Sequence, residues 1–302
     1  MKKEINKEAK SRSESGQLKD YLLQWHSKVT AAAYEKEIKE YLKYNPKASK
    51  AGYKEIVSYI SHLRTKYSNG KTIDRNLCSI KAYYKYLCHT EKRKDNPARA
   101  IQLRDKENKA IQLQDLFTAE ELEKLLNKPA LKTILSRRNK LLITLLIYQG
   151  LQARELEQLT TTDVNLNKGT ITIKASTTTN RRELPLRPNQ ILLLNEYLKE
   201  DRPKLLNKKQ SAQLLLNITG DQSKSGDFTA YVKRRFKGMF TGRPVTITTI
   251  RQSVVRNLLK AGNDLRTVQV YAGHKCPSTT EKYKQSQVEE LQTAINKHHP
   301  FK

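Results

Sequence analysis

One stretch near the C-terminus constrains this chain more than any other, because it fixes the order of several chemically distinctive residues. It covers residues 246–283 and reads TITTIRQSVVRNLLKAGNDLRTVQVYAGHKCPSTTEKY. We expect Arg251 to lie at the start of a helix that is closed by Gly262, since glycine favours the left-handed conformation that ends many helices. A Gly-His pair follows at residues 273–274, and then a Thr-Thr-x-x-Tyr motif that ends at Tyr283.

In that order and spacing the stretch resembles the C-terminal signature of the tyrosine recombinase family, which includes phage integrases and Xer-like proteins. The resemblance implies that Tyr283 is the nucleophile, Arg251 the second catalytic arginine and His274 the second histidine. It also implies the reaction. The tyrosine hydroxyl attacks a DNA phosphate, giving a 3′-phosphotyrosyl link and a free 5′ hydroxyl, and rejoining reverses the step. No metal and no other cofactor is implied, because fixed cations stabilise the charged transition state.

Three further positions of the family pattern carry other residues here. The Gly-Leu-Arg-x-x-Glu-Leu motif is replaced by GLQARELEQL, which puts Gln152 at the first arginine. The His-x-x-Arg motif becomes Thr-Thr-Ile-Arg, with Thr248 at the first histidine. The hairpin lysine, counted back from the Pro-Leu pair at 185–186, falls at Thr177. The nucleophile would then face its phosphate with one family arginine instead of two, which predicts a slow enzyme, one completed by a partner subunit, or an inactive one.

Three nearby cations are candidates to replace the lost charges: Lys174, Arg154 and Arg181. Arg154 follows Gln152 by two residues, and two helical steps turn a side chain by roughly 200°, so we do not expect both to fill the same space. Lys174 precedes Thr177 by three residues, which in a strand is the opposite face. A hairpin turn of different length would bring Lys174, Arg181 or Arg182 into reach.

The charge of the chain indicates a polyanionic partner. Lys and Arg number 58 against 30 Asp and Glu, a net charge of +28, and the basic residues are spread along the whole length. Nucleic acid is the usual polyanion, and the resemblance makes it double-stranded DNA. An RNA-binding or ribosome-linked protein is an alternative that rests on charge alone.

Two other features bear on location. The N-terminus has no apolar segment typical of a signal peptide, and the most apolar run, residues 141–148, is too short to span a bilayer. Three cysteines, an odd number without a C-x-x-C pair, argue against a disulfide framework and against a zinc site. These features predict a cytoplasmic protein without a membrane segment.

The sequence predicts a mainly α fold with a small β-hairpin in the C-terminal domain, arranged as a two-domain DNA clamp. Residues 1–16 read as a basic flexible arm, 17–97 as a helical core-binding (SAM-like) domain, 98–114 as a linker and 115–302 as the catalytic-type domain. In the first domain, helices are expected from Leu18 to Trp25, over 30–43, around 56–63 and over 72–88, because apolar residues recur there at helical spacing.

The fourth of these helices has the clearest pattern. A buried stripe is predicted for Ile73, Leu77, Ile80, Tyr84 and Leu87. The basic residues Lys71, Arg75, Lys81 and Lys85 lie off that stripe and are predicted to contact DNA. For any single one of them, a solvated surface position is an equally good interpretation.

In the second domain, Thr118 and Glu121 form a capping box that should begin a helix. Residues 141–148 are apolar on all sides and predict the central buried helix. Alternation at 170–174 and 182–186 predicts a hairpin, and helices are expected over 188–200 and 227–239. Val288, Leu291 and Ile295 predict an amphipathic tail helix.

Two functions fit these observations. One is an atypical tyrosine recombinase that integrates, excises or inverts DNA, and the other is a pseudo-recombinase that binds DNA as an architectural or regulatory protein. The resemblance implies a homo-oligomer, with four protomers on two duplexes joined through the tail helix. A second recombinase subunit or an accessory factor would supply what the altered site lacks.

Overall fold

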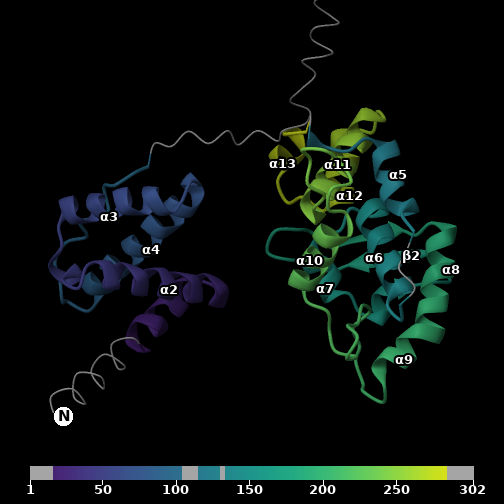
Figure 1. Cartoon of the computed structure of the whole chain (residues 1–302), viewed down its shortest axis with the longest axis horizontal. Coiled ribbons are helices and arrows are strands. Elements are labelled where there is room, and N and C mark those ends of the chain that lie inside the picture. The colour runs from purple at the N-terminus through teal and green to yellow at the C-terminus, as the bar shows by residue number, and fades with distance from the viewer. Residues whose placement is uncertain (1–15, 104–114, 130–132, 284–302) are drawn as a thin grey trace, which may run out of the picture. The chain divides into compact units, whose positions relative to one another are not determined.

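The computed structural model describes residues 16–103, 115–129 and 133–283. The chain divides into two compact units, residues 1–109 and 110–302, and each is described by itself (Figure 1). Both units are mainly helical, and the second also contains a small antiparallel sheet, as the sequence predicted.

The first unit is a group of helices with a short 3-10 turn. A helix covers residues 16–25. It is followed by α2 (Lys28–Tyr44), η1 (Ala48–Lys50), α3 (Tyr53–Lys66) and α4 (Gly70–His89). Polar side chains begin two of them: Ser27 accepts a hydrogen bond at the start of α2, and Asn69 does so at the start of α4. These four helices are those predicted from apolar spacing.

The core of this unit is rich in tyrosine. The whole predicted stripe of α4 is buried, and Tyr84 within it contacts Tyr41 and Tyr83, while Tyr59 packs on Tyr41. The hydroxyl oxygens of Tyr41 and Tyr84 are 2.7 Å apart, so each buried hydroxyl has a partner. Trp25 departs from prediction, because its side chain is 70% exposed rather than part of the apolar face.

The first unit continues past Pro97, where the linker was predicted to begin. Ala98 and Ile101 are buried and belong to the same hydrophobic core. The described part of the predicted linker, residues 98–103, is therefore packed structure, because Ala98 and Ile101 are buried in that core and Leu103 packs against it.

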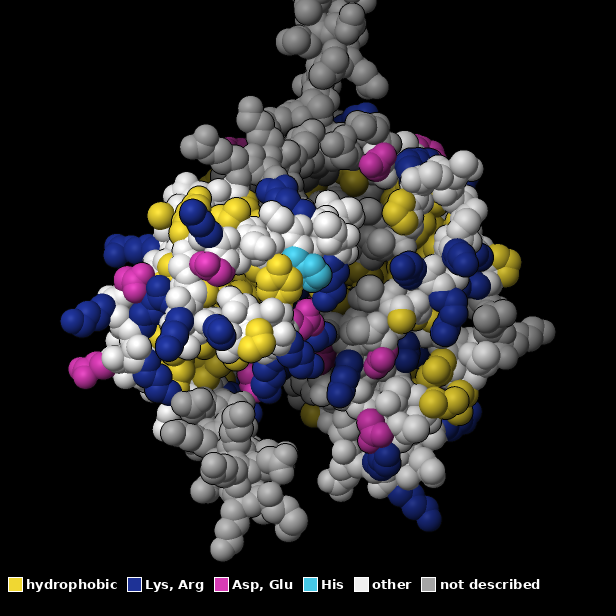
Figure 2. Space-filling model, turned by 60° about the vertical axis from the view of Figure 1, so that its left-hand side comes forward, with side chains coloured by type: hydrophobic (Ala, Val, Ile, Leu, Met, Phe, Trp, Pro, Cys, Tyr) yellow, Lys and Arg dark blue, Asp and Glu magenta, His cyan; other side chains and the backbone are white. Residues whose placement is uncertain are grey.

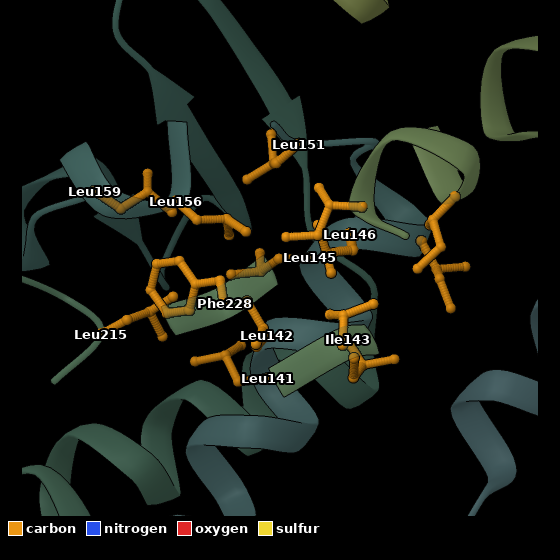
Figure 3. Close-up of a cluster of buried hydrophobic side chains, with 14 of the residues drawn as sticks. Leu141, Leu142, Ile143, Leu145, Leu146, Leu151, Leu156, Leu159, Leu215 and Phe228 are labelled. Carbon is orange, nitrogen blue, oxygen red and sulfur yellow. The ribbon is translucent and has the colours of Figure 1, made fainter. Parts of the chain in front are cut away.

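The second unit is built around α6 (Ser136–Tyr148), which packs against α5 (Ala119–Asn127), α8 (Pro188–Glu196) and α11 (Ile247–Lys260) (Figure 1). Every side chain from Leu141 to Ile147 is buried, as predicted for a helix that is apolar on all sides. Figure 3 shows leucines of α6 close to Phe228, which comes from α10 (Ser225–Arg235). The capping box that begins α5 is also present.

The sheet has the strand order β1-β2-β3, with β1 (Val164–Asn165), β2 (Thr170–Ile173) and β3 (Arg182–Pro185) all antiparallel to their neighbours. The predicted hairpin is formed by β2 and β3, with Ile173 opposite Arg182. The short strand β1 was not predicted, because two residues give no alternation to recognise.

The remaining elements complete the second unit: α7 (Ala153–Gln158), η3 (Thr161–Asp163), the π-helical turn η4 (Tyr197–Asp201), α9 (Arg202–Leu206), α12 (Leu265–Ala272) and α13 (Pro277–Glu281). The helix predicted over 188–200 is α8 continued by η4, and the one predicted over 227–239 is α10. The predicted arm at 1–16, apart from its last residue, and the tail helix lie outside the described residues.

Candidate active site

A cavity of about 700 Å³ in the second unit collects the six positions that the family resemblance singled out. They are Gln152, Thr177, Thr248, Arg251, His274 and Tyr283. They come from the start of α7, the β2–β3 loop, α11 and the segment from α12 to α13. These segments are far apart in sequence, so their convergence is a property of the tertiary fold.

Arg251 is fixed by backbone carbonyls. It lies in the second turn of α11 and not at the helix start as predicted, because Thr246 is the residue that caps this helix. Its guanidinium donates to the carbonyl oxygen of Gly150 at 2.6 Å and to that of Ala272 at 2.5 Å. The side chain is buried, yet it reaches the cavity wall. The two carbonyls are neutral and hold the guanidinium in place, and its charge is offset in part by Glu155 at 3.7 Å.

His274 is positioned by a tight turn and by a hydroxyl. Gly273 ends α12 with φ +70°, and a Cβ there would lie 2.6 Å from the Nη1 of Arg182, so glycine is required. The Nδ1 of His274 lies 2.9 Å from the hydroxyl of Thr280. Burial, followed by the positive charge of Arg251, lowers the pKa of His274 to about 4. The imidazole is therefore neutral at physiological pH, with one ring nitrogen that can accept a hydrogen bond and one that can donate one.

Tyr283 lies in the turn just after α13, two residues beyond its last residue, and is half-buried. Its ring is nearly parallel to that of His274, with an interplanar angle of 7° and 6.5 Å between the ring centroids. Burial raises the pKa of Tyr283, while Arg251 and a hydrogen bond with Gln252 act in the opposite direction. The phenol is thus protonated at neutral pH, and a fixed positive charge is available nearby when it loses its proton.

A buried ion pair beneath the cavity was missed by the sequence reasoning. Arg182 donates from Nη1 and Nη2 to the two carboxylate oxygens of Glu155, at 2.7 and 3.0 Å, and both side chains are 2% exposed. Glu155 also accepts from the backbone N–H of Gln152 and lies 3.7 Å from Arg251. Burial alone would raise the pKa of Glu155, but Arg182, the backbone N–H of Gln152 and the charge of Arg251 together outweigh it, and the pKa lies below its usual value. The pair ties α7, β3 and α11 together under the site.

A sequence signal for this pair did exist. Along β3, Arg182 and Leu184 are buried while Glu183 and Pro185 are exposed. The arginine thus occupies an inward position of an alternating strand. An arginine at such a position needs a buried carboxylate as partner.

The three substituted positions contribute no charge to the cavity. Gln152 is the N-cap of α7 and has an extended backbone. Thr177 lies in the β2–β3 loop, and Thr248 lies in the first turn of α11. Both threonines are exposed and Gln152 is half-buried.

The structure separates the three cations that were candidates to replace the missing charges. Arg154 and Gln152 both line the cavity, although two helical steps would have turned their side chains apart. The reason is that Gln152 caps the helix instead of lying within it, so the helical rotation does not separate the two side chains. Lys174 is paired with Asp163 at 3.1 Å, and neither it nor the exposed Arg181 is part of the cavity lining. Lys275, which sequence reasoning did not consider, does line the cavity.

The predicted DNA-contacting residues lie on α4 of the first unit. Lys71, Arg75 and Lys85 are exposed, and Lys81 is half-buried. Arg75 donates to Glu37 at 2.6 Å, so its charge is partly neutralised within the unit. Figure 2 shows Lys and Arg side chains spread over the visible surface with fewer acidic ones, in line with the net charge of +28.

The described ranges contain no group of three or more His, Cys, Asp or Glu that could hold a metal ion. Cys78, Cys88 and Cys276 are free thiols. No helix in the described part of the chain is long and apolar enough to cross a membrane.

Comparison with known proteins gives consistent matches. Residues 115–290 match the phage integrase family, and residues 17–91 match the phage integrase N-terminal SAM-like domain. Tyrosine recombinase XerD of Halalkalibacterium halodurans is 28% identical over 263 residues, covering 85% of this chain and 87% of the relative. The XerD of Listeria monocytogenes is 28% identical over 279 residues, covering 90% and 92%.

Solved structures give the same fold. The XerH site-specific recombinase bound to its palindromic difH substrate has a TM-score of 0.69 at 22% identity, covering 89% of this chain and 79% of that one. The Tn1549 transposon integrase in complex with circular intermediate DNA also has a TM-score of 0.69, at 15% identity, covering 93% and 98%.

Proposed function

Because the chain belongs to the phage integrase family of tyrosine recombinases, we propose that it is a site-specific recombinase that breaks and rejoins DNA through a 3′-phosphotyrosyl intermediate. The observation that carries this proposal is the cavity, in which Tyr283 lies beside the buried, charged Arg251 and the neutral His274. A phenol, a fixed cation and a neutral imidazole are three of the groups that transfer of a phosphodiester to tyrosine uses.

Each of the three residues has a distinct role in the proposed reaction. The hydroxyl oxygen of Tyr283 attacks the phosphorus. The guanidinium of Arg251 binds a non-bridging oxygen and stabilises the added negative charge of the transition state. His274, held at Nδ1 by Thr280, hydrogen-bonds the phosphate or exchanges protons through its other nitrogen.

Arg154 supplies, in this proposal, the positive charge that Gln152 lacks. Arg154 is the second residue of α7, and its side chain lines the same cavity. A guanidinium can bind phosphate oxygens through two parallel hydrogen bonds, whereas the amide of Gln152 offers a donor without charge.

The DNA partner is proposed to be held by both units. The basic residues of α4, with Arg75 the weakest contributor because of Glu37, contact backbone phosphates, and residues 115–302 form the catalytic-type domain. Four protomers on two duplexes, joined through the segment after Tyr283, complete the assembly.

Affinity for DNA should fall steeply with salt, with a logarithmic slope of about −0.9 per neutralised phosphate. A flat salt dependence would contradict DNA binding through phosphates.

Covalent trapping tests the reaction directly. Nicked suicide substrates drawn from the DNA flanking the gene are incubated with wild type and with Tyr283→Phe, and denaturing gels detect the adduct. We expect a slow-migrating protein–DNA adduct that is lost entirely in Tyr283→Phe. Tyr53→Phe, at a tyrosine that is 56% exposed in the first unit, is the matched control and should behave as wild type.

The alternative is a pseudo-recombinase, and the absence of charge at Gln152, Thr177 and Thr248 favours it. It predicts tight, salt-sensitive binding to the same DNA with no adduct. The variant Gln152→Arg then tests whether the missing arginine is what limits DNA cleavage. If the missing arginine alone limits the reaction, this variant should raise the cleavage rate by roughly 10- to 100-fold. Tight binding without an adduct from either wild type or Gln152→Arg would establish the pseudo-recombinase.

A further inference from the structure

One cation in the cavity has no counterpart in the motifs that the sequence revealed. Lys275 follows His274 in the turn between α12 and α13, and its side chain lines the cavity together with Tyr283. The residue is exposed, so its ammonium is accessible to a bound substrate. Within the described ranges it makes no hydrogen bond or ion pair with another residue.

The backbone places Lys275 next to the position of the missing hairpin lysine. Thr179 and His274 form an isolated antiparallel bridge, and the N–H of Asn180 donates to the carbonyl of Gly273 at 2.8 Å. In an antiparallel arrangement the residue before Thr179 faces the residue after His274. Thr178 and Lys275 are that pair, and both line the cavity beside Thr177.

The other cations around the cavity are engaged or chemically unsuited to donate a proton. Lys174 is paired with Asp163 and lies outside the lining. Arg182 is committed to Glu155. Arg251 and Arg154 are arginines, and a guanidinium gives up its proton too reluctantly to act as a general acid. A lysine ammonium can do so, and it is a flexible point donor that suits a single leaving oxygen.

We propose that Lys275 is the general acid that protonates the leaving 5′ oxygen, in place of the lysine that Thr177 replaces; this rests on the proposed recombinase function. The bond from the Tyr283 hydroxyl oxygen to phosphorus forms, and the bond from phosphorus to O5′ breaks. The phenolic proton passes to water, and the Lys275 ammonium gives its proton to O5′, which leaves as a hydroxyl. On rejoining, the neutral amine takes the proton back from that hydroxyl.

The test compares two leaving groups. Suicide substrates are made with the ordinary 5′ oxygen and with a bridging 5′ sulfur at the scissile phosphate. A thiolate leaves without a proton, so a lost general acid matters only for the oxygen substrate. We expect Lys275→Gln to slow cleavage of the oxygen substrate by roughly 10²-fold and to leave the sulfur substrate roughly unchanged. Lys275→Arg keeps the charge but is a poor acid, so it should behave like Lys275→Gln. Lys174→Gln is the matched control and should cleave both substrates at the wild-type rate.

Several outcomes would overturn the assignment. Equal losses on both substrates would make Lys275 a phosphate-binding or structural residue, and full activity of Lys275→Arg would make its role electrostatic. A selective loss in Lys174→Gln would move the proton donor to that lysine. If wild type cleaves the sulfur substrate but not the oxygen substrate, the site has no general acid. If wild type forms no Tyr283-dependent adduct with either substrate, the proposed function itself fails, and the role of Lys275 fails with it.

Discussion

The two sides of the cavity differ in how their residues are held. On one side, Arg251 and His274 are buried and are bound by Gly150, Ala272 and Thr280. On the other side, the three substituted positions are half-buried or exposed and face the cavity. Arg251 and His274 therefore contribute to the fold whatever their part in the reaction, whereas the second side can change at less cost to the core.

This difference changes how the active-site pattern is interpreted. An arginine that holds two backbone carbonyls has a structural reason to be present, so Arg251 and His274 are weaker indicators of catalysis than their match to the family suggests. Tyr283 carries more weight, because it is half-buried and lines the cavity, and phenylalanine would keep its ring while removing only the hydroxyl. Packing does not explain why Gln152, Thr177 and Thr248 are uncharged. Their lack of charge is therefore informative about the rate of the reaction.

The largest effect is expected for the ion pair beneath the first side. Arg182→Ala leaves the buried Glu155 without its bidentate partner and should lower the free energy of unfolding by about 3–5 kcal/mol. The neighbouring Arg181→Ala, at an exposed position, should change it by no more than about 0.5 kcal/mol. Urea unfolding monitored by circular dichroism gives both values.

A double variant sharpens this prediction. Arg182→Met combined with Glu155→Gln removes both charges and should recover part of the lost stability, because no uncompensated carboxylate remains buried. If Arg182→Ala unfolds at the same urea concentration as Arg181→Ala, the pair does not support the first side and the comparison fails.

The next largest effect concerns rate. Arg251→Gln removes a preorganised charged donor and should slow adduct formation by roughly 10²–10³-fold. Gln152→Ala removes a neutral donor and should cost at most about tenfold, the value of an ordinary hydrogen bond. Single-turnover cleavage of the suicide substrate measures both rates. Equal losses in the two variants would show that the uncharged side contributes as much as the charged one.

A further effect, confined to acidic pH, is a dependence of stability on pH. The pKa of His274 is about 4 in the folded chain against an ordinary value of 6.5, so the unfolded chain binds a proton that the folded chain rejects. The stability contributed by this group is fully present above pH 6.5 and is lost as the pH falls towards 4.

Urea midpoints at pH 7, 5.5 and 4.5 measure this dependence. The midpoint of wild type should fall more steeply than that of His274→Gln, in which the other titrating groups are unchanged. Parallel curves would mean that His274 titrates normally, and the rigid first side would then be less buried than described.

Local patterns allowed much of the fold to be predicted from the sequence. Four features could be predicted in this way: the buried stripe of α4, the capping box before α5, the wholly apolar α6 and the β2–β3 hairpin. The reason is that helical and strand periodicity encode which face is buried. The identities at residues 246–283 also revealed the family. Domain boundaries that depend on packing could not be predicted. Ala98 and Ile101 belong to the core of the first unit, although the sequence around them is typical of a linker.

The sequence by itself determined which residue types are present at the family positions, including the uncharged Gln152, Thr177 and Thr248. Only the tertiary structure decided which other side chains share their cavity. Arg154 enters it because Gln152 caps a helix, and Lys275 enters it because a backbone bridge joins two distant segments. Arg182 is withdrawn from the cavity by Glu155. Such contacts depend on how separate elements pack, and local periodicity contains no information about that packing.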